Sequence, residues 1–155
     1  MPEINSTILI TDDELSIRRS LNVILRKKYN ILTSATGAEA LVKINKEHVD
    51  LILLDLNLPD THGLEVLRQV KQIDENIMVI IITAVRDTKT AVEAMKMGAY
   101  DYITKPFDIS ELRALVDKAL EKRALIKENV SLRSEAAKES FGEIIGRSNE
   151  TQEIF

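Results

Sequence analysis

The chain has 155 residues, 45% hydrophobic and 30% charged, a composition that suits one globular domain of ordinary size with an appendage. The net charge of −4 gives no general attraction for nucleic acid or for an anionic membrane. The absence of Cys excludes a disulfide framework, a thiol nucleophile and a zinc–thiolate site. No apolar run approaches the ~20 residues of a membrane helix, and no basic N-terminal stretch leads into an apolar one. We therefore expect a cytoplasmic protein with no membrane contact.

Apolar runs of strand length alternate with helical patterns along the chain. The predicted strands occupy residues 8–10, 29–33, 51–54, 78–82 and 100–103. The predicted helices between them occupy residues 15–28, 37–46, 63–72 and 88–97. Asp12 or Asp13 stands where the first of these helices would be capped. Gly98 would end the fourth, and Pro106 breaks the chain after the last strand.

The order of these elements predicts the fold class. The run from Leu51 to Leu54 is too short and too apolar for a surface helix, so it indicates a strand covered on both faces, as in a parallel sheet. Strands that alternate with helices of this length require right-handed crossovers and helices on both faces of the sheet. We therefore predict a doubly wound α/β fold with a five-stranded parallel sheet.

A fifth helix would start at Asp108 or Ser110, and its pattern runs on through residue 139 without Gly or Pro. Mostly apolar positions alternate four and three apart along it, at Leu112, Val116, Ala119, Arg123, Ile126, Val130, Arg133 and Ala137. Such a seam is typical of a two-helix coiled coil, here with two Arg interruptions. A solvated helical linker is the alternative. Residues 140–155 change character, with two Gly and an adjacent Ile pair.

Polar side chains follow four of the predicted strands. Asp12 and Asp13 come after the first strand and Asp55 after the third. Thr83 ends the fourth strand, and Lys105 follows the fifth. In open α/β sheets, ligands collect in the crevice beyond the carboxyl ends of the strands. Three carboxylates held close together repel one another unless a cation lies between them, and hard oxygen ligands without His or Cys select Mg²⁺ or Mn²⁺.

The same residues suit phosphoryl transfer. A bound metal would neutralise an incoming phosphoryl group, while Lys105 offers its oxygens a charge and Thr83 a hydroxyl. Asp55 would be the nucleophile, because attack of a carboxylate on phosphorus gives an acyl phosphate. Each residue also has a plain structural explanation: Asp12 and Asp13 as a helix cap, Asp55 as a turn cap, Thr83 as a strand residue and Lys105 as a surface lysine. Their occurrence together, in register, favours one shared site.

Four motifs carry a family resemblance: TDDE (11–14), LLDLNLPDTHGLEVL (53–67), ITA (82–84) and YDYITKPF (100–107). In content and order they resemble the receiver domain of two-component response regulators, over residues 7 to about 120. The resemblance implies a flavodoxin-like (βα)5 fold. It also implies a protein that takes a phosphoryl group from a histidine kinase and loses it by slow, self-catalysed hydrolysis, and that is not otherwise an enzyme.

The resemblance assigns the metal and the acceptor residue by residue. It implies that Asp55 is the phospho-acceptor and that the cofactor is Mg²⁺. Asp13 would bind the metal directly, and Asp12 mainly through water. Asn57 would supply its backbone carbonyl.

The resemblance also implies a switch. Thr83 and Lys105 would bind the phosphoryl oxygens, and Tyr102 would change rotamer as the Thr83 hydroxyl moves. The surface of the fourth helix and fifth strand would respond. The Lys105–Pro106 peptide bond is usually cis in this family.

The segments AVEAMKMGAYDYITKPFD (91–108) and FGEIIGRSNETQEIF (141–155) are similar to sigma-54-dependent activators of the nitrogen-regulator type. The expected organisation is a receiver at 1–120, a helical linker at 121–139 and the start of a truncated ATPase at 140–155. No GxxxxGK[ST] loop or helix-turn-helix follows, so we expect neither ATP hydrolysis nor DNA binding by this chain. Contacts with sigma-54 RNA polymerase and DNA would belong to other parts of the parent protein. The last helix and linker would join a homodimer.

Two rival functions stay open on the residues alone. An aspartyl-nucleophile phosphatase of the haloacid dehalogenase type needs a second Asp two residues after the nucleophile, at the end of the first strand. Here position 57 is Asn, and Asp55 follows the third predicted strand. A flavodoxin-like mononucleotide binder needs a phosphate-cradling loop after the first strand, where Asp12 and Asp13 would repel phosphate. A metal titration with and without a phosphodonor would distinguish the three.

Overall fold

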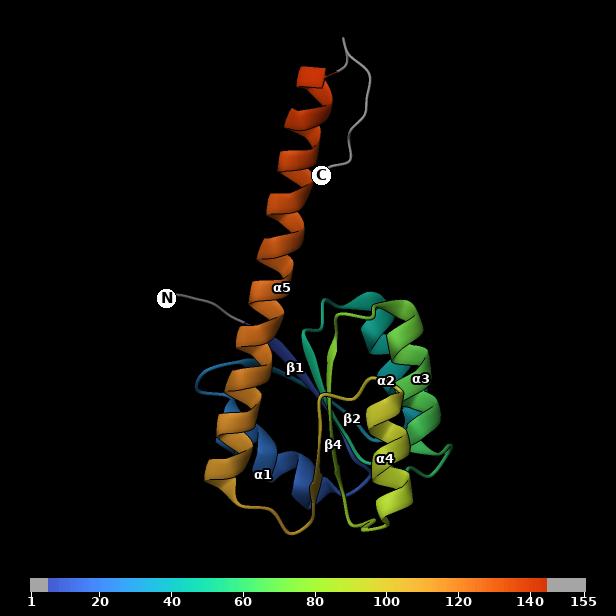
Figure 1. Ribbon diagram of the computed structural model, residues 1–155. Helices are drawn as coiled ribbons and strands as arrows, with labels where there is room; N and C mark the ends of the chain where they lie inside the picture. The colour runs from blue at the N-terminus through green and yellow to red at the C-terminus, as the bar shows by residue number, and fades with distance from the viewer. Residues whose placement is uncertain (1–5, 145–155) are drawn as a thin grey trace. The chain divides into compact units, whose positions relative to one another are not determined.

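The structure, a computed structural model, describes the backbone of residues 6–144 and the side chains of residues 6–126. Strands and helices alternate along these residues (Figure 1). The strands are β1 (Thr7–Thr11), β2 (Asn30–Ser34), β3 (Leu51–Leu54), β4 (Met78–Thr83) and β5 (Asp101–Thr104). The helices are α1 (Leu15–Leu25), α2 (Gly37–Lys46), α3 (Gly63–Ile73), α4 (Thr88–Lys96) and α5 (Ile109–Ile144). Among the described residues, no helix has the length and apolar character needed to span a bilayer.

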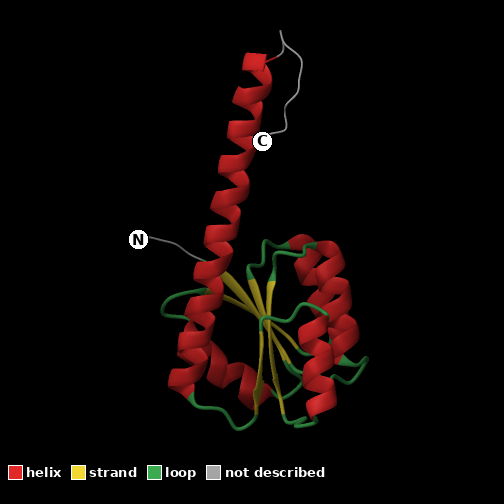
Figure 2. Cartoon of the chain, in the orientation of Figure 1, coloured by secondary structure: helices red, strands yellow, loops and turns green. Residues whose placement is uncertain are grey.

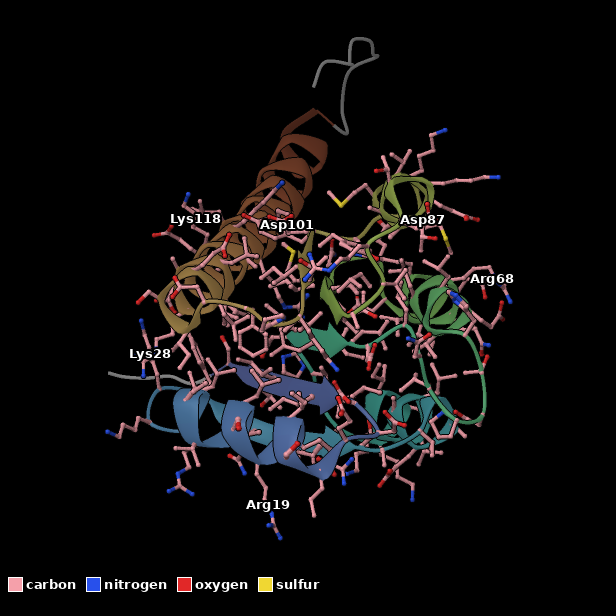
Figure 3. All side chains as sticks on the ribbon, turned by 90° about the horizontal axis from the view of Figure 1, so that it is seen from below. Arg19, Lys28, Arg68, Asp87, Asp101 and Lys118 are labelled. Atoms are coloured by element: carbon pink, nitrogen blue, oxygen red, sulfur yellow. The ribbon has the colours of Figure 1, made fainter. Side chains whose placement is uncertain are left out.

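The five strands form one parallel sheet in the order β2-β1-β3-β4-β5. The chain winds outward from β1 in both directions, so the direction of winding reverses between β1 and β3. Helix α1 and the first part of α5, residues 109–120, lie on one face of the sheet, and α2, α3 and α4 lie on the other (Figure 2). The labelled charged side chains of Arg19, Lys28 and Arg68 point away from the sheet (Figure 3). The predicted doubly wound α/β fold is confirmed.

The core lies on both faces of the three central strands, because alternate residues of a strand point to opposite faces. On the side of α2, α3 and α4, the buried strand residues include Leu9, Ile52, Leu54, Val79 and Ile81. The alternate positions are also buried, among them Ile8, Ile10, Leu51, Leu53 and Ile80. Full burial of each such side chain stabilises the fold by about 1.5–3 kcal/mol. The continuous apolar runs of β3 and β4 therefore reflect burial on both faces.

The start of α1 differs from the prediction. The residue at its N-cap position is Glu14, whose side chain makes no capping hydrogen bond. Asp12 accepts a hydrogen bond from the Glu14 N–H at 2.9 Å and so turns the chain between β1 and α1. The predicted capping of α1 by Asp12 or Asp13 is therefore wrong: β1 continues to Thr11, which leaves both residues in the connection rather than at the helix terminus.

The seam predicted along the last helix begins inside the domain. Leu112, Val116 and Ala119 are fully buried, on the part of α5 that lies beside the sheet (Figure 1). They are therefore not available to a second helix, and this part of the coiled-coil prediction is wrong. The chain divides into two units, Met1–Leu120 and Glu121–Phe155. The seam side chains of Val130, Arg133 and Ala137 lie outside the described residues, as does the structure of residues 145–155.

Candidate functional site

Two carboxylates lie side by side where β1 and β3 end. The Asp55 N–H donates to the Thr11 carbonyl at 3.0 Å, which extends the pairing of β3 with β1 by one residue. The Asp12 N–H donates to the Ser34 carbonyl at 3.1 Å, which extends the pairing of β1 with β2. Asp12 is 3% exposed and Asp55 is 5% exposed, whereas the neighbouring Asp13 is exposed. Oxygen atoms of the three carboxylates lie within 4.8 Å of one another.

Lys105 compensates the buried charge. Its Nζ donates to Oδ2 of Asp12 at 2.7 Å and to Oδ2 of Asp55 at 3.1 Å. It also reaches Oε1 of Glu14 at 3.2 Å. The Lys105 N–H donates to the Thr83 carbonyl at 2.8 Å, which fixes the residue at the end of β5 beside β4. The Lys105–Pro106 peptide bond is cis.

The pKa values of Asp12 and Lys105 reflect both burial and the charges of their neighbours. Burial raises the pKa of the Asp12 carboxyl above its ordinary value, although the hydrogen bond from Lys105 acts in the opposite direction. Burial by itself would lower the pKa of the Lys105 ammonium, but its hydrogen bonds with the Asp12 and Asp55 carboxylates outweigh this and raise that pKa. Lys105 therefore stays charged at physiological pH.

The donor set fits a divalent cation. Three carboxylates within 4.8 Å of one another offer oxygen ligands only, which is the chemistry that Mg²⁺ prefers. Asn57 brings its main chain to the same place, because its N–H donates to Oδ1 of Asp55 at 3.1 Å. Asp12, Asp13, Asp55 and the carbonyl of Asn57 are therefore the groups that could hold the ion.

Thr83 and Tyr102 meet at the main chain of Val85. Thr83 is fully buried at the end of β4, and its Oγ1 accepts a long hydrogen bond of 3.4 Å from the Val85 N–H. The Tyr102 hydroxyl donates to the Val85 carbonyl at 2.7 Å. Burial, followed by the charges of Asp87 and Asp55, raises the pKa of Tyr102. One residue of the β4–α4 loop thus connects the two positions predicted to switch.

The loop from Asp55 to Gly63 is closed at its base. The Gly63 N–H donates to the Leu56 carbonyl at 2.8 Å, and Asn57 forms an isolated antiparallel bridge with His62. A Cβ on Gly63 would lie 2.5 Å from the Cα of Leu56 and 2.6 Å from the carbonyl oxygen of Asp55. Only glycine therefore allows this closure without a shift of the backbone.

A known protein family shares this sequence pattern. The family model of the response regulator receiver domain matches residues 8–117. The chain belongs to this family. The receiver is 44% identical over 117 residues to sporulation initiation phosphotransferase F of Bacillus subtilis (strain 168), covering 75% of this chain and 94% of that protein. The alternative of an aspartyl-nucleophile phosphatase is not favoured.

Longer proteins are also similar to this receiver. It is 38% identical over 117 residues to transcriptional regulatory protein ZraR of Escherichia coli (strain K12), covering 75% of this chain but only 26% of that protein. The crystal structure of NtrX from Brucella abortus superposes with a TM-score of 0.77 at 33% identity, covering 84% of this chain and 30% of that one. Both matches cover under a third of the longer protein.

The structure brings most of the predicted site residues of this receiver together. Oxygens of Asp12, Asp13 and Asp55 lie within 4.8 Å of one another, and Lys105 contacts two of the three carboxylates. Thr83 and Tyr102 are linked through Val85 rather than to each other. Val85 and Glu14 also belong to the site, although neither was predicted from the sequence. Glu14 directly follows Asp12 and Asp13 in the sequence. Its part in the site is shown by its contact with Lys105, which is 91 residues away along the chain.

Proposed function

We propose that this receiver accepts a phosphoryl group on Asp55 from a histidine kinase, in a reaction that requires Mg²⁺. The observation that carries the proposal is the shared ammonium of Lys105, which contacts the buried carboxylates of Asp55 and Asp12 together. An ammonium held between two carboxylates at strand ends is already placed to receive phosphoryl oxygens once one carboxylate is phosphorylated.

In the transfer, an oxygen of Asp55 forms a bond to phosphorus while the phosphorus–nitrogen bond of the donor's phosphohistidine breaks, and the imidazole leaves with the electron pair. Bound Mg²⁺ would supply charge neutralisation, held by Asp13 directly, by Asp12 mainly through water and by the Asn57 carbonyl. The Lys105 ammonium turns from Asp55 to a phosphoryl oxygen. Slow hydrolysis at the same site restores the free carboxylate.

The test is labelling with a phosphorylated kinase or with acetyl phosphate, followed by intact-mass measurement. The wild-type chain should gain one phosphoryl group only when Mg²⁺ is present, and Asp55→Asn should gain none. Asp50→Asn is the matched control, because Asp50 is a buried carboxylate at the opposite end of the same strand. A phosphoryl adduct on Asp55→Asn equal to that of the wild type would refute the assignment.

The output of the site is a change in the surface around α4 and β5. Phosphorylation draws the hydroxyl of Thr83 toward the phosphoryl group and away from the Val85 N–H, and Tyr102 moves into the space it leaves. This route is supported by the contacts of Val85, whose N–H bonds to Thr83 and whose carbonyl bonds to Tyr102. A movement of Thr83 would therefore be passed to Tyr102 through Val85.

The parent protein would be a cytoplasmic sigma-54-dependent transcription activator. Support comes from the similarity to ZraR and NtrX and from the motifs at residues 91–108 and 141–155. Residues 1–120 would be the receiver, 121–139 a helical linker and 140–155 the start of an ATPase. Contacts with sigma-54 RNA polymerase and DNA would lie in the remainder of that protein. The homodimer would form through α5 beyond the part that is buried on the sheet.

A further inference from the structure

Asp60 is an exposed residue, and both oxygens of its carboxylate accept hydrogen bonds from the main chain. It lies in the loop between β3 and α3. Its Oδ1 accepts a hydrogen bond from the Gly37 N–H and its Oδ2 accepts one from the Ala38 N–H, both at 2.9 Å. Gly37 and Ala38 are the first two residues of α2, whose N–H groups have no partner within the helix. These two bonds lower the pKa of the Asp60 carboxyl.

The contact between Asp60 and α2 depends on close packing at Gly37, the first residue of the helix. A Cβ on Gly37 would lie 2.6 Å from Cγ2 of Thr61 and 2.8 Å from Cγ2 of Val66. A larger residue at position 37 would therefore push the helix terminus away from the β3–α3 loop and from α3. The glycine allows the close approach that brings Asp60 within bonding distance of two main-chain N–H groups.

Helix α2 has a cap of its own. The Thr36 Oγ1 accepts a hydrogen bond from the Glu39 N–H at 3.0 Å, and Glu39 Oε1 accepts one from the Ala35 N–H at 2.8 Å. These two bonds resemble a capping box, except that Glu39 bonds the residue before the N-cap, and both are local to the start of α2. The start of α2 is thus capped without the two bonds to Asp60. The main effect of those two bonds is therefore to hold the β3–α3 loop, which carries Asp60.

That loop is the one that carries Asn57. Its base is closed by the hydrogen bond between Gly63 and Leu56 and by the bridge between Asn57 and His62. Its other anchored point is Asp60, three residues after Asn57. The main chain of Asn57 is therefore held from both sides, by the closed base and by α2.

We propose that Asp60 is a positioning residue: by anchoring the β3–α3 loop to the first turn of α2, it fixes the Asn57 carbonyl in the orientation that a divalent cation requires. Helix α2 thereby supports the metal site from outside it. This inference rests on the proposed function, in which Asn57 contributes that carbonyl. Groups that orient a metal ligand from outside the coordination sphere commonly change metal affinity when they are removed.

The experiment compares Asp60→Ala and Asp60→Asn with wild type. Mg²⁺ affinity is measured from amide chemical shifts, independently of labelling, and the Mg²⁺ concentration for half-maximal labelling of Asp55 is measured in parallel. Asp60→Ala should lower the Mg²⁺ affinity by about tenfold and raise the Mg²⁺ concentration for half-maximal labelling by the same factor, which is the lower end of the usual effect of such partners. Saturating Mg²⁺ should restore labelling. Asp60→Asn keeps one acceptor oxygen, so its Mg²⁺ affinity should lie between those of wild type and Asp60→Ala. Amide exchange over residues 56–62 should accelerate in Asp60→Ala.

Thr36→Ala is the matched control, because it removes a capping bond from the same helix but leaves both bonds to Asp60. It should lower the stability of α2 without changing Mg²⁺ affinity. Unchanged Mg²⁺ affinity in Asp60→Ala, or an equal loss in Thr36→Ala, would overturn the proposal. If Asp60→Ala does not fold, Asp60→Asn decides by the same criterion. A wild-type chain that binds Mg²⁺ but is never labelled would refute the proposed function while the affinity comparison still tests Asp60.

Discussion

The ammonium of Lys105 lies 3.1 Å from Oδ2 of Asp55, although the two residues are 50 positions apart. Lys105 follows β5 and Asp55 follows β3, so the side chain of Lys105 reaches past the end of β4, which lies between these strands. The same ammonium contacts Asp12. The free protein therefore balances its two buried carboxylates with the group that the proposed phosphoryl transfer also uses, and several consequences can be measured.

Replacing Lys105 should destabilise the protein in the absence of metal. Lys105→Met leaves Asp12 and Asp55 buried without their ammonium, and breaking a buried ion pair on one side costs about 3 kcal/mol or more. Urea unfolding at neutral pH should show this loss, and saturating Mg²⁺ should reduce it. Lys28→Met is the control: its partner Asp117 and Lys28 itself are both well exposed, so it should cost under about 1 kcal/mol. Equal losses in the two variants would contradict this account.

Asp12→Asn should stabilise the metal-free protein at neutral pH and weaken Mg²⁺ binding. The pKa of Asp12 is raised in the folded state, chiefly by burial, so ionisation costs more in the folded chain than in the unfolded one. That penalty is fully present above the raised pKa and disappears as the pH falls below the unfolded value of about 4. The gain of the variant over wild type should therefore shrink between neutral pH and about pH 3.5. A less stable variant at pH 7 would show that the ion pair with Lys105 outweighs burial.

Thr83→Ala should separate phosphorylation from the structural response. The variant keeps Asp55 and Lys105, so it should still be labelled, but it lacks the hydroxyl that bonds to Val85. Amide exchange over residues 84–107 should then change much less on labelling than in wild type. Thr104→Ala is a suitable control, because Thr104 is the register partner of Thr83 on β5. A wild-type exchange response in Thr83→Ala would refute the route through Val85.

The chain truncated after Ile126 should associate less than the intact chain. This end point keeps Ala119 and Leu120, which are buried, so the receiver should stay folded. It removes the part of α5 where the predicted seam continues. Sedimentation equilibrium should give a larger average mass for the intact chain at the same concentration. Equal masses would reject the later part of α5 as the dimer contact.

The sequence by itself determined the fold class and the composition of the site. Strand β3 and helix α2 occupy the predicted residues 51–54 and 37–46, because a short continuous apolar run and apolar residues at helical spacing are local signals. Asp12, Asp55 and Lys105 were predicted to converge because the carboxyl ends of parallel strands share one edge. That inference also assumed that the first, third, fourth and fifth strands lie side by side, and the strand order β2-β1-β3-β4-β5 confirms this.

Only the tertiary structure decided the order of the strands and what each side chain contacts. A spacing of four and three is shared by a helix packed on a sheet and by a coiled coil, so Leu112 and Val116 could not be assigned to either from the pattern. The contacts of Glu14 with Lys105 and of Asp60 with α2 join residues 91 and at least 22 positions apart. Such contacts depend on how the elements pack, and no local preference of the chain encodes them.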